Sequence, residues 1–592
     1  MPAGEEDMTE NNDNNMMQQM MLDNFMHVSQ AMGQQFMSMV QNNLQNMNLH
    51  QAPNLQNGLT PEQAKLRVMQ EEFAARHANL WQAMVQGRPS GEEETANKDR
   101  RFSDEVWSQS PFYDYLRQAY LINADFLRNL ADSTPLEDRR MRERMQFFAR
   151  QVIDAYAPSN FAALNPEFIQ TALATNGQSI RDGIQNMLAD LQKGHISMTD
   201  ESAFEVGRNL AVTPGAVIYE NELIQLLQYA PSTEKVARTP LLVVPPCINK
   251  FYIMDLQPEN SFVRFMVEQG YTVFLISWKN PDAENAQTTW DDYLQKGPLT
   301  ALEVVRDVTG VAQAHTLGFC IGGTLLSCAL AVAAARGENP AASLTLMTTL
   351  LDFAESGEIN CLIDEASVAA REAAVGKGGL MAGQELANVF SFLRANDLVW
   401  QYVVGNYMKG GTPRPFDLLY WNCDSTNLAG PFLAWYLRNM YLENSLRVPG
   451  RLTMLGESID LGKLAMPTYL MAAKEDHIVP WIGAYLGRNL FAQPARFVLS
   501  ASGHIAGAIN PASKNRRSYW TNDGSAGSES AEDWFAGAEE HPGSWWNDWI
   551  AWLNKLSGSR KVAARGVLGN ERHRPIEPAP GRYVKQKATI AV

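Results

Sequence analysis

The chain has 592 residues and is 45% hydrophobic, so it is long enough for several domains with a substantial core. Its net charge of −16 argues against a nucleic-acid-binding protein, because such proteins present a basic face. The five cysteines show no C-x-x-C pairing, which excludes a disulfide scaffold and a cysteine zinc site. We therefore expect a reducing, cytoplasmic location, no metal, no cofactor and no nucleic-acid partner.

Residues 1–60 are rich in Met, Asn and Gln, and the first cation of the chain is Lys65. A secretory signal with a cationic start is therefore not predicted. Such polar sequence buries too little apolar surface to offset chain entropy, so a mostly disordered arm is expected. The alternative is a Met-rich helix that packs against an apolar surface.

Residues 61–205 predict an all-α N-terminal domain without a catalytic constellation. Thr60 followed by Pro61 is the pattern of an N-cap and a first helical position. Apolar residues then recur at helical spacing in LRVMQEEFAARHANLWQAMV, DYLRQAYLINADFLRNLAD and MRERMQFFARQVIDAY.

Residues 206–592 alternate strand-like and helical patterns. The short apolar, buried-type strand patterns are LLVVPP (241–246), YTVFLISW (271–278), AHTLGFC (314–320), SLTLMTTLLDF (343–353), PTYLMAA (467–473) and ARFVLSA (495–501). Repeated βαβ units predict an α/β fold with a mainly parallel sheet covered on both faces. The aromatic-rich stretch 354–445 breaks the rhythm and is interpreted as an inserted cap. The uncharged stretch 317–335 is interpreted as strand, turn and helix, so no membrane span is expected.

Gly318-Phe319-Cys320-Ile321-Gly322 is a G-x-C-x-G pattern between a predicted strand and a predicted helix. It matches the nucleophile elbow of α/β-hydrolases with cysteine in place of serine; small neighbours let the backbone turn sharply. The positive end of the following helix favours a thiolate at Cys320.

A cysteine nucleophile needs a base, and the base needs a residue that orients it. In the α/β-hydrolase order of nucleophile, acid and histidine, the last two residues follow late strands. Asp476 follows PTYLMAA, and His504 follows ARFVLSA. The sequence therefore predicts a Cys320–His504–Asp476 triad at the carboxyl edge of the sheet. His477 competes for the role of base, but its position beside Asp476 favours a supporting role.

An oxyanion hole needs two backbone donors. The N–H of Ile321, directly after the nucleophile, is the first candidate. The second is expected in the loop VVPPCINK, where Pro245 and Pro246 have no N–H, so that Cys247 and Ile248 offer the first donors. For the side chain of Cys247 itself, core packing is favoured over a role as a second thiol.

The segments GFCIGGT, VPPCINK, ESAFEVGRN, WKNPD, TTLLDF, FSFLRANDLVW, KEDHIVPW and SGHIAGAINP together resemble the class I polyhydroxyalkanoate synthases of bacteria. The resemblance extends from about residue 65 to about residue 588. It implies an α/β-hydrolase core with a cap that gates the site and contributes to dimer contact. It also implies a homodimeric acyltransferase that polymerises (R)-3-hydroxyacyl-CoA, foremost 3-hydroxybutyryl-CoA, at a polyester granule, with granule-surface proteins as further partners. In that family the positions of Cys320, Asp476 and His504 are catalytic. The Met-rich beginning departs from the family pattern.

The residue chemistry agrees with this resemblance, because a thiol exchanges one thioester for another at little net energy. We expect His504 to take the thiol proton and later to activate a hydroxyl. Our hypothesis is that Asp476 orients His504 and helps to deprotonate the incoming 3-hydroxyl. Arg394 and Lys250 are candidate contacts of the CoA phosphates, and Ala506 is a candidate for the wall of the acyl pocket.

Two other functions remain as alternatives. A cysteine-dependent hydrolase such as a thioesterase would need the same triad and would pass the acyl group to water. A non-catalytic granule protein with a degenerate hydrolase fold would not need a complete triad. The long shared segments and the cap favour the synthase.

Overall fold

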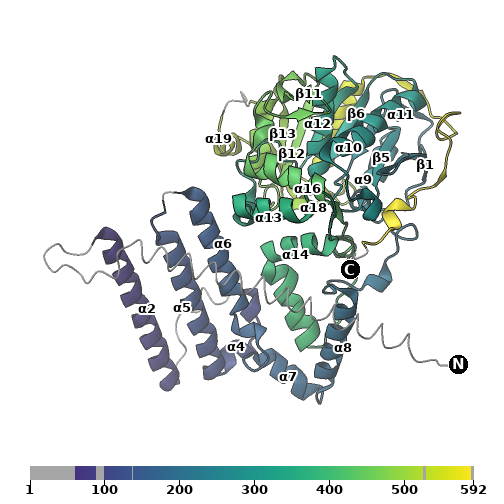
Figure 1. The fold of residues 1–592 in the computed structure, drawn as a ribbon. Coiled ribbons are helices and arrows are strands. Elements are labelled where there is room, and N and C mark those ends of the chain that lie inside the picture. Colours follow the sequence, from purple (N-terminus) through teal and green to yellow (C-terminus); the bar gives the residue numbers. More distant parts are fainter. Residues whose placement is uncertain (1–59, 88–98, 137, 525–528, 589–592) are drawn as a thin grey trace. The chain divides into compact units, whose positions relative to one another are not determined.

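The computed structural model describes residues 60–87, 99–136, 138–524 and 529–588 (Figure 1). Apart from Thr60, the expected N-terminal arm lies outside the described residues. The chain divides into two compact units. The first comprises residues 1–199 and 390–414, and the second comprises residues 200–389 and 415–592.

The first unit is helical. Its α-helices before residue 200 are α2 (Pro61–Val85), α4 (Val106–Gln109), α5 (Pro111–Ser133), α6 (Arg139–Ala155), α7 (Pro166–Ala174) and α8 (Gln178–Lys193). The predicted start of the first helix is confirmed, because the Thr60 hydroxyl accepts a hydrogen bond from the N–H of Gln63 at 3.2 Å. A small core of Phe102, Trp107, Tyr120 and Ile153 holds α4, α5 and α6 together.

The second unit is built on an 11-stranded sheet with the order β15-β14-β13-β12-β7-β6-β4-β5-β2-β1-β17. From β13 to β5 all neighbouring strands are parallel. These central strands are β4 (Leu241–Val244), β5 (Val273–Trp278), β6 (Ala314–Phe319), β7 (Ala341–Met347), β12 (Thr468–Ala473) and β13 (Arg496–Ser500). The predicted mainly parallel core is confirmed.

Antiparallel strands flank the core on both sides. They are β1 (Gly215–Glu220), β2 (Ile224–Tyr229) and β17 (Glu577–Pro578) on one side, and β14 (Ser518–Thr521) and β15 (Glu539–Pro542) on the other. The sequence patterns did not predict these strands. β2 is buried at every position, but Gln225 and Gln228 interrupt its apolar run, and β15 and β17 are short and mostly exposed.

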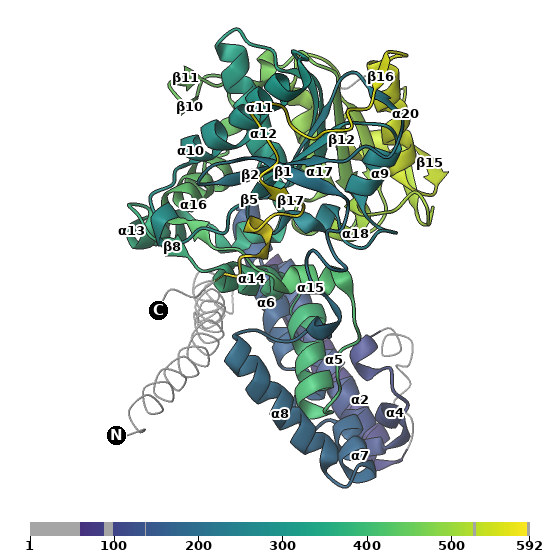
Figure 2. The ribbon, with the colours of Figure 1, turned by 90° about the vertical axis from the view of Figure 1, so that its right-hand side faces the viewer.

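Side chains of the central strands alternate between two apolar cores, as the period of a strand requires. Leu242 and Val244 belong to the core that includes residues of α10 (Trp290–Leu294), α11 (Thr300–Thr309), α12 (Ile321–Ala335) and α17 (Trp481–Leu486). Leu241 and Val243 belong to the other core, with α9 (Phe262–Glu268) and α20 (Trp545–Ser557). Figure 2 shows α9 and α20 on the side of the sheet away from α10 and α11. Burial on both faces explains why most residues of these strands are apolar, with buried polar exceptions such as Thr316 and Ser343.

The chain between β7 and β12 leaves the sheet before it returns to a strand adjacent to β7. It carries α13 (Glu365–Val375), β8 (Leu380–Met381), α14 (Gly383–Leu393), α15 (Asp417–Cys423), β9 (Leu428–Ala429) and α16 (Gly430–Tyr436). Phe390–Arg414 of this insertion belongs to the first unit. In the second unit the Trp290 ring of α10 stacks on Phe432, Trp435 and Tyr436, which packs α16 against α10.

The uncharged stretch from Leu317 to Ala335 divides between the end of β6 and α12, with a sharp turn between them. Throughout the described part of the chain, no helix combines the length and the apolar character that crossing a bilayer requires.

Candidate active site

The turn between β6 and α12 presents Cys320 in a strained conformation, with φ 53° and ψ −130°. Its two flanking glycines are required by space. A Cβ on Gly318 would lie 2.3 Å from the Gly323 Cα, and a Cβ on Gly322 would lie 2.4 Å from the carbonyl oxygens of Val244 and Pro245. The N–H groups of Gly323 and Thr324 close the first turn of α12 on the Cys320 carbonyl, at 2.8 and 3.3 Å. The G-x-C-x-G pattern therefore reflects close backbone approach at the elbow.

His504 and Asp476 follow the carboxyl ends of β13 and β12, as predicted. The Asp476 Oδ2 accepts a hydrogen bond from the His504 Nδ1 at 2.6 Å. The Asp476 Oδ1 accepts from the backbone N–H groups of Ile478 and Val479, both at 2.9 Å. The Asp476 side chain is 0% exposed, so its carboxylate is fixed by three donors and withdrawn from solvent.

The structure brings the imidazole of His504 to Cys320 as well. The ring stacks on Phe319, the residue before the cysteine, with centroids 5.6 Å apart. Burial lowers the pKa of His504, but the negative charges of Asp476 and Cys320, together with hydrogen bonds to both side chains, outweigh burial and raise it to about 10. The protonated imidazole is therefore the favoured form beside the sulfur at neutral pH.

The loop after β4 lies against the start of α12, since the Pro245 carbonyl faces Gly322. The Trp278 indole N–H donates to the same carbonyl at 2.9 Å and fixes the loop. Cys247 is buried, and burial raises the pKa of its thiol, with a further rise from the charge of Cys320. The loop carrying the predicted donors Cys247 and Ile248 thus lies near Ile321, the first residue of α12.

The structure also places the candidate supporting residues. Arg394 belongs to the first unit and pairs with Asp397 at 3.9 Å. Lys250, the other candidate for a CoA phosphate contact, is buried, and its amine donates to the Gln586 carbonyl. His477 is half-buried, while the Asp476 carboxylate beside it bonds to His504. Ala506 lies in α18 (His504–Ala508), and its carbonyl accepts from Arg517.

Two tyrosines of the insertion lie near the nucleophile and were not predicted. Tyr436 and Tyr441 hydrogen-bond to each other, and burial raises the pKa of both hydroxyls, with further rises from the charge of Cys320. Phe353 packs edge-on against both rings. The sequence showed only an aromatic-rich stretch here, because nothing in the spacing of Tyr436 and Tyr441 indicates which aromatic residue faces the sulfur.

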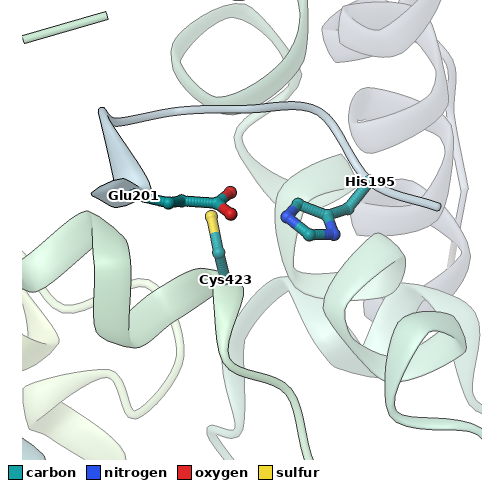
Figure 3. Close-up of side chains that lie close together, drawn as sticks. All are labelled: His195, Glu201 and Cys423. Carbon is teal, nitrogen blue, oxygen red and sulfur yellow. The ribbon is translucent and has the colours of Figure 1, made fainter. Parts of the chain in front are cut away.

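Figure 3 labels His195, Glu201 and Cys423, which are residue types that bind metals. His195 belongs to the first unit, and Glu201 and Cys423 belong to the second. Because the placement of the units relative to each other is not determined, these residues do not define a metal site.

Comparison with known proteins identifies the family. The family described as poly-beta-hydroxybutyrate polymerase (PhaC) N-terminus matches residues 98–266. The poly(3-hydroxyalkanoate) polymerase subunit PhaC of Cupriavidus necator is 55% identical over 530 residues, which cover 89% of this chain and 89% of that protein. The chain belongs to the poly(3-hydroxyalkanoate) polymerase family. The polymerase subunit of Rhizobium meliloti is 41% identical over 86% of this chain and 84% of its own.

The fold of this polymerase agrees with a second family match, the alpha/beta hydrolase fold, over residues 240–511. That range includes Cys320, Asp476 and His504. Among solved structures, the monoacylglycerol lipase of Paleococcus ferrophilus aligns with 48% of this chain and 90% of its own, with 12% identity and a TM-score of 0.31. The predicted family and the predicted α/β-hydrolase core are both confirmed.

Proposed function

We propose that this polymerase takes (R)-3-hydroxyacyl-CoA, foremost 3-hydroxybutyryl-CoA, and joins the acyl groups into polyester through a covalent intermediate on Cys320. One observation carries the proposal. His504 is hydrogen-bonded to Asp476, its ring stacks on Phe319, and the charge of the adjacent Cys320 raises its pKa, at an elbow between a strand and a helix. This arrangement supplies a nucleophile, a base and an orienting carboxylate in one buried cluster.

The first half-reaction is acylation. The Cys320 thiolate attacks the thioester carbonyl, and the N–H of Ile321 with a donor of the Cys247–Ile248 loop stabilises the oxyanion. The C–S bond to CoA then breaks, and His504 gives its proton to the departing CoA thiolate. The products are free CoA and an acyl-Cys320 thioester, so one thioester bond has replaced another at little net cost.

The second half-reaction is ester formation. Neutral His504 removes the proton of a 3-hydroxyl, and the resulting alkoxide attacks an acyl thioester carbonyl. The C–S bond breaks, an ester forms, and the released thiolate takes back its charge-assisted pairing with protonated His504. Asp476 takes part through His504, because its own oxygens are held by His504, Ile478 and Val479 in a fully buried position.

Transfer to a hydroxyl rather than to water requires a dry site. Phe353 and Tyr441 belong to the apolar core against which Cys320 packs, and Phe353 also contacts Tyr436, which supports this requirement. A growing chain attached to the enzyme also explains a location at the polyester granule in the cytoplasm, where granule-surface proteins are further partners. A homodimer is proposed on the resemblance alone, and light scattering of the purified enzyme tests it.

The function is tested by supplying 3-hydroxybutyryl-CoA and following free CoA and turbidity together. We expect CoA release with insoluble polyester from the wild type, and neither from Cys320→Ala. CoA release without polymer would instead indicate a thioesterase. Absence of both in the folded wild type would leave a non-catalytic granule protein.

A further inference from the structure

The segment Glu577–Lys587, here called the C-terminal strap, is fastened along one edge of the sheet. Its first residues form β17, which pairs with β1 through Val217 and Ala216. Arg582 forms ion pairs with Glu220 and Glu577. The Tyr583 N–H then donates to the buried Gln225 side chain at 3.1 Å, and the Tyr583 hydroxyl donates to the Asn221 carbonyl at 2.8 Å. The strap is therefore an ordered part of the second unit.

The end of the strap contacts the loop that follows β4. Lys250 is 3% exposed, and its amine donates a hydrogen bond to the Gln586 carbonyl. The next residue, Lys587, pairs with Asp424 at 3.0 Å, and the Tyr252 hydroxyl donates to the other oxygen of Asp424 at 3.1 Å. The strap thus bonds to the loop directly and also through Asp424.

The insertion between β7 and β12 also contacts this loop. The Trp421 indole N–H donates to the Lys250 carbonyl at 2.7 Å, and Asn249 forms a β-bridge with Ser425. Burial lowers the pKa of Lys250 to about 8, against the opposing charge of Asp424 and with the repulsion of Lys587. A buried amine is costly unless it is hydrogen-bonded, and the Gln586 carbonyl supplies that hydrogen bond.

Lys250 lies close in the chain to the predicted donors of the oxyanion hole. It follows Cys247 by three residues, a span of at most about 11 Å in extended chain. Trp278 anchors the start of the loop through the Pro245 carbonyl, and Lys250 anchors its end through the Gln586 carbonyl. The donors Cys247 and Ile248 lie between these two anchors. An oxyanion donor must be held in place before the reaction, because reorienting it during the reaction would consume the stabilisation.

We propose that Lys250 and the C-terminal strap together form a positioning device that holds the Cys247–Ile248 donors of the oxyanion hole in place. Lys250 acts through the backbone of its loop and does not touch the substrate. This proposal rests on the proposed function, since an oxyanion hole has meaning only if Cys320 attacks a carbonyl. It assigns the end of the strap a role in the acylation chemistry.

The test compares two reactions of the same sulfur in Lys250→Met. Acylation by 3-hydroxybutyryl-CoA, read as the single-turnover burst of CoA, forms an oxyanion; alkylation of Cys320 by iodoacetamide does not. We expect the acylation rate to fall about ten- to a hundredfold, since a misplaced donor costs less than an absent one. Alkylation, followed on the Cys320 peptide by mass spectrometry, should stay within about twofold of the wild type, because no oxyanion donor takes part in it.

Lys587→Met is the second test variant, because this lysine lies on the strap with its side chain 64% exposed and reaches the loop only through Asp424. It should show the same selective loss to a smaller extent, and it serves as the main test if Lys250→Met fails to fold. Equal loss of acylation and alkylation, or no loss of acylation in folded variants, would overturn the proposal. A wild type that releases no CoA would instead overturn the proposed function, so the two failures are distinguishable.

Discussion

Replacing Asp476 by Asn should damage ester formation far more than acylation. The two oxygens of Asp476 have different partners: Oδ1 accepts from the N–H groups of Ile478 and Val479, and Oδ2 accepts from the His504 Nδ1. In the variant, the two backbone donors hold the amide oxygen at the Oδ1 position. The amide nitrogen must then face Nδ1, and its N–H obliges that ring nitrogen to become an acceptor.

The ring proton of neutral His504 is thereby moved to Nε2, the nitrogen that should accept the proton of the incoming hydroxyl. In serine proteases, the wrong tautomer of the catalytic histidine costs about 10⁴ in turnover. We expect a loss of about 10³- to 10⁴-fold in elongation for the same reason. Acylation depends less on the tautomer, because a thiol is a far stronger acid than an alcohol and can lose its proton to solvent, while Nε2–H still donates to the thiolate. Loss of the charge assistance alone should slow acylation about 10- to 100-fold.

The assay separates the steps in one preparation. A rapid-quench experiment gives the burst of CoA, which reports acylation, and turbidity with product length gives elongation. Asp476→Ala is the companion variant, because alanine leaves the tautomer of His504 free. Its elongation should be no slower than that of Asp476→Asn, provided that thermal unfolding shows both to be folded. Equal loss of the two steps in Asp476→Asn would refute this reasoning.

Two further predictions concern stability. Gly322→Ala places a Cβ 2.4 Å from the Val244 and Pro245 carbonyl oxygens, so we expect a loss of about 1–3 kcal/mol or more in urea unfolding, and loss of CoA release. Gly405→Ala is its control, because a Cβ there meets no atom within 4 Å; an equal loss in both variants would contradict the steric account. Burial lowers the pKa of His315 from 6.5 to about 4, so between these pH values the unfolded chain binds a proton that the native protein does not. Stability from this group is present at neutral pH and is lost as the pH falls, by about 3 kcal/mol in total. In His315→Gln this part of the acid loss should be absent. Urea titrations of both proteins at pH 7 and pH 4.5 measure the free energy of unfolding, and an equal loss in wild type and variant would contradict the prediction.

The central strands and the elbow were predictable because local sequence specifies them. Val243 and Leu275 lie in mostly apolar runs, as expected for a strand that is buried on both faces. Gly318 is required by its close approach to Gly323 in the same turn, whereas Gly322 is required by its close approach to the loop after β4. Asp476 and His504 follow strands of the same type, so their place at the sheet edge could be derived from order alone.

The remaining features depend on contacts between distant segments. Lys250 was expected to face a phosphate, but it bonds to Gln586, which is 336 residues away in the chain. Tyr441 lies beside Cys320 only because the insertion folds back over the sheet. Neither contact leaves a periodic signature, since each involves one side chain and an unrelated part of the sequence. The division of the insertion at Phe390–Arg414, which belongs to the helical unit, is of the same kind.

The pairing of β17 with β1 has a consequence for biosynthesis. A ribosome makes Gly215–Glu220 long before Glu577–Pro578, so this margin of the sheet stays open while most of the chain is being translated. The central parallel strands are complete earlier, at Ser500. A nascent chain would thus carry its nucleophile and base well before the strap secures the adjoining loop. Late closure of this margin therefore leaves the loop after β4 without its contact to Gln586 until the strap has been made.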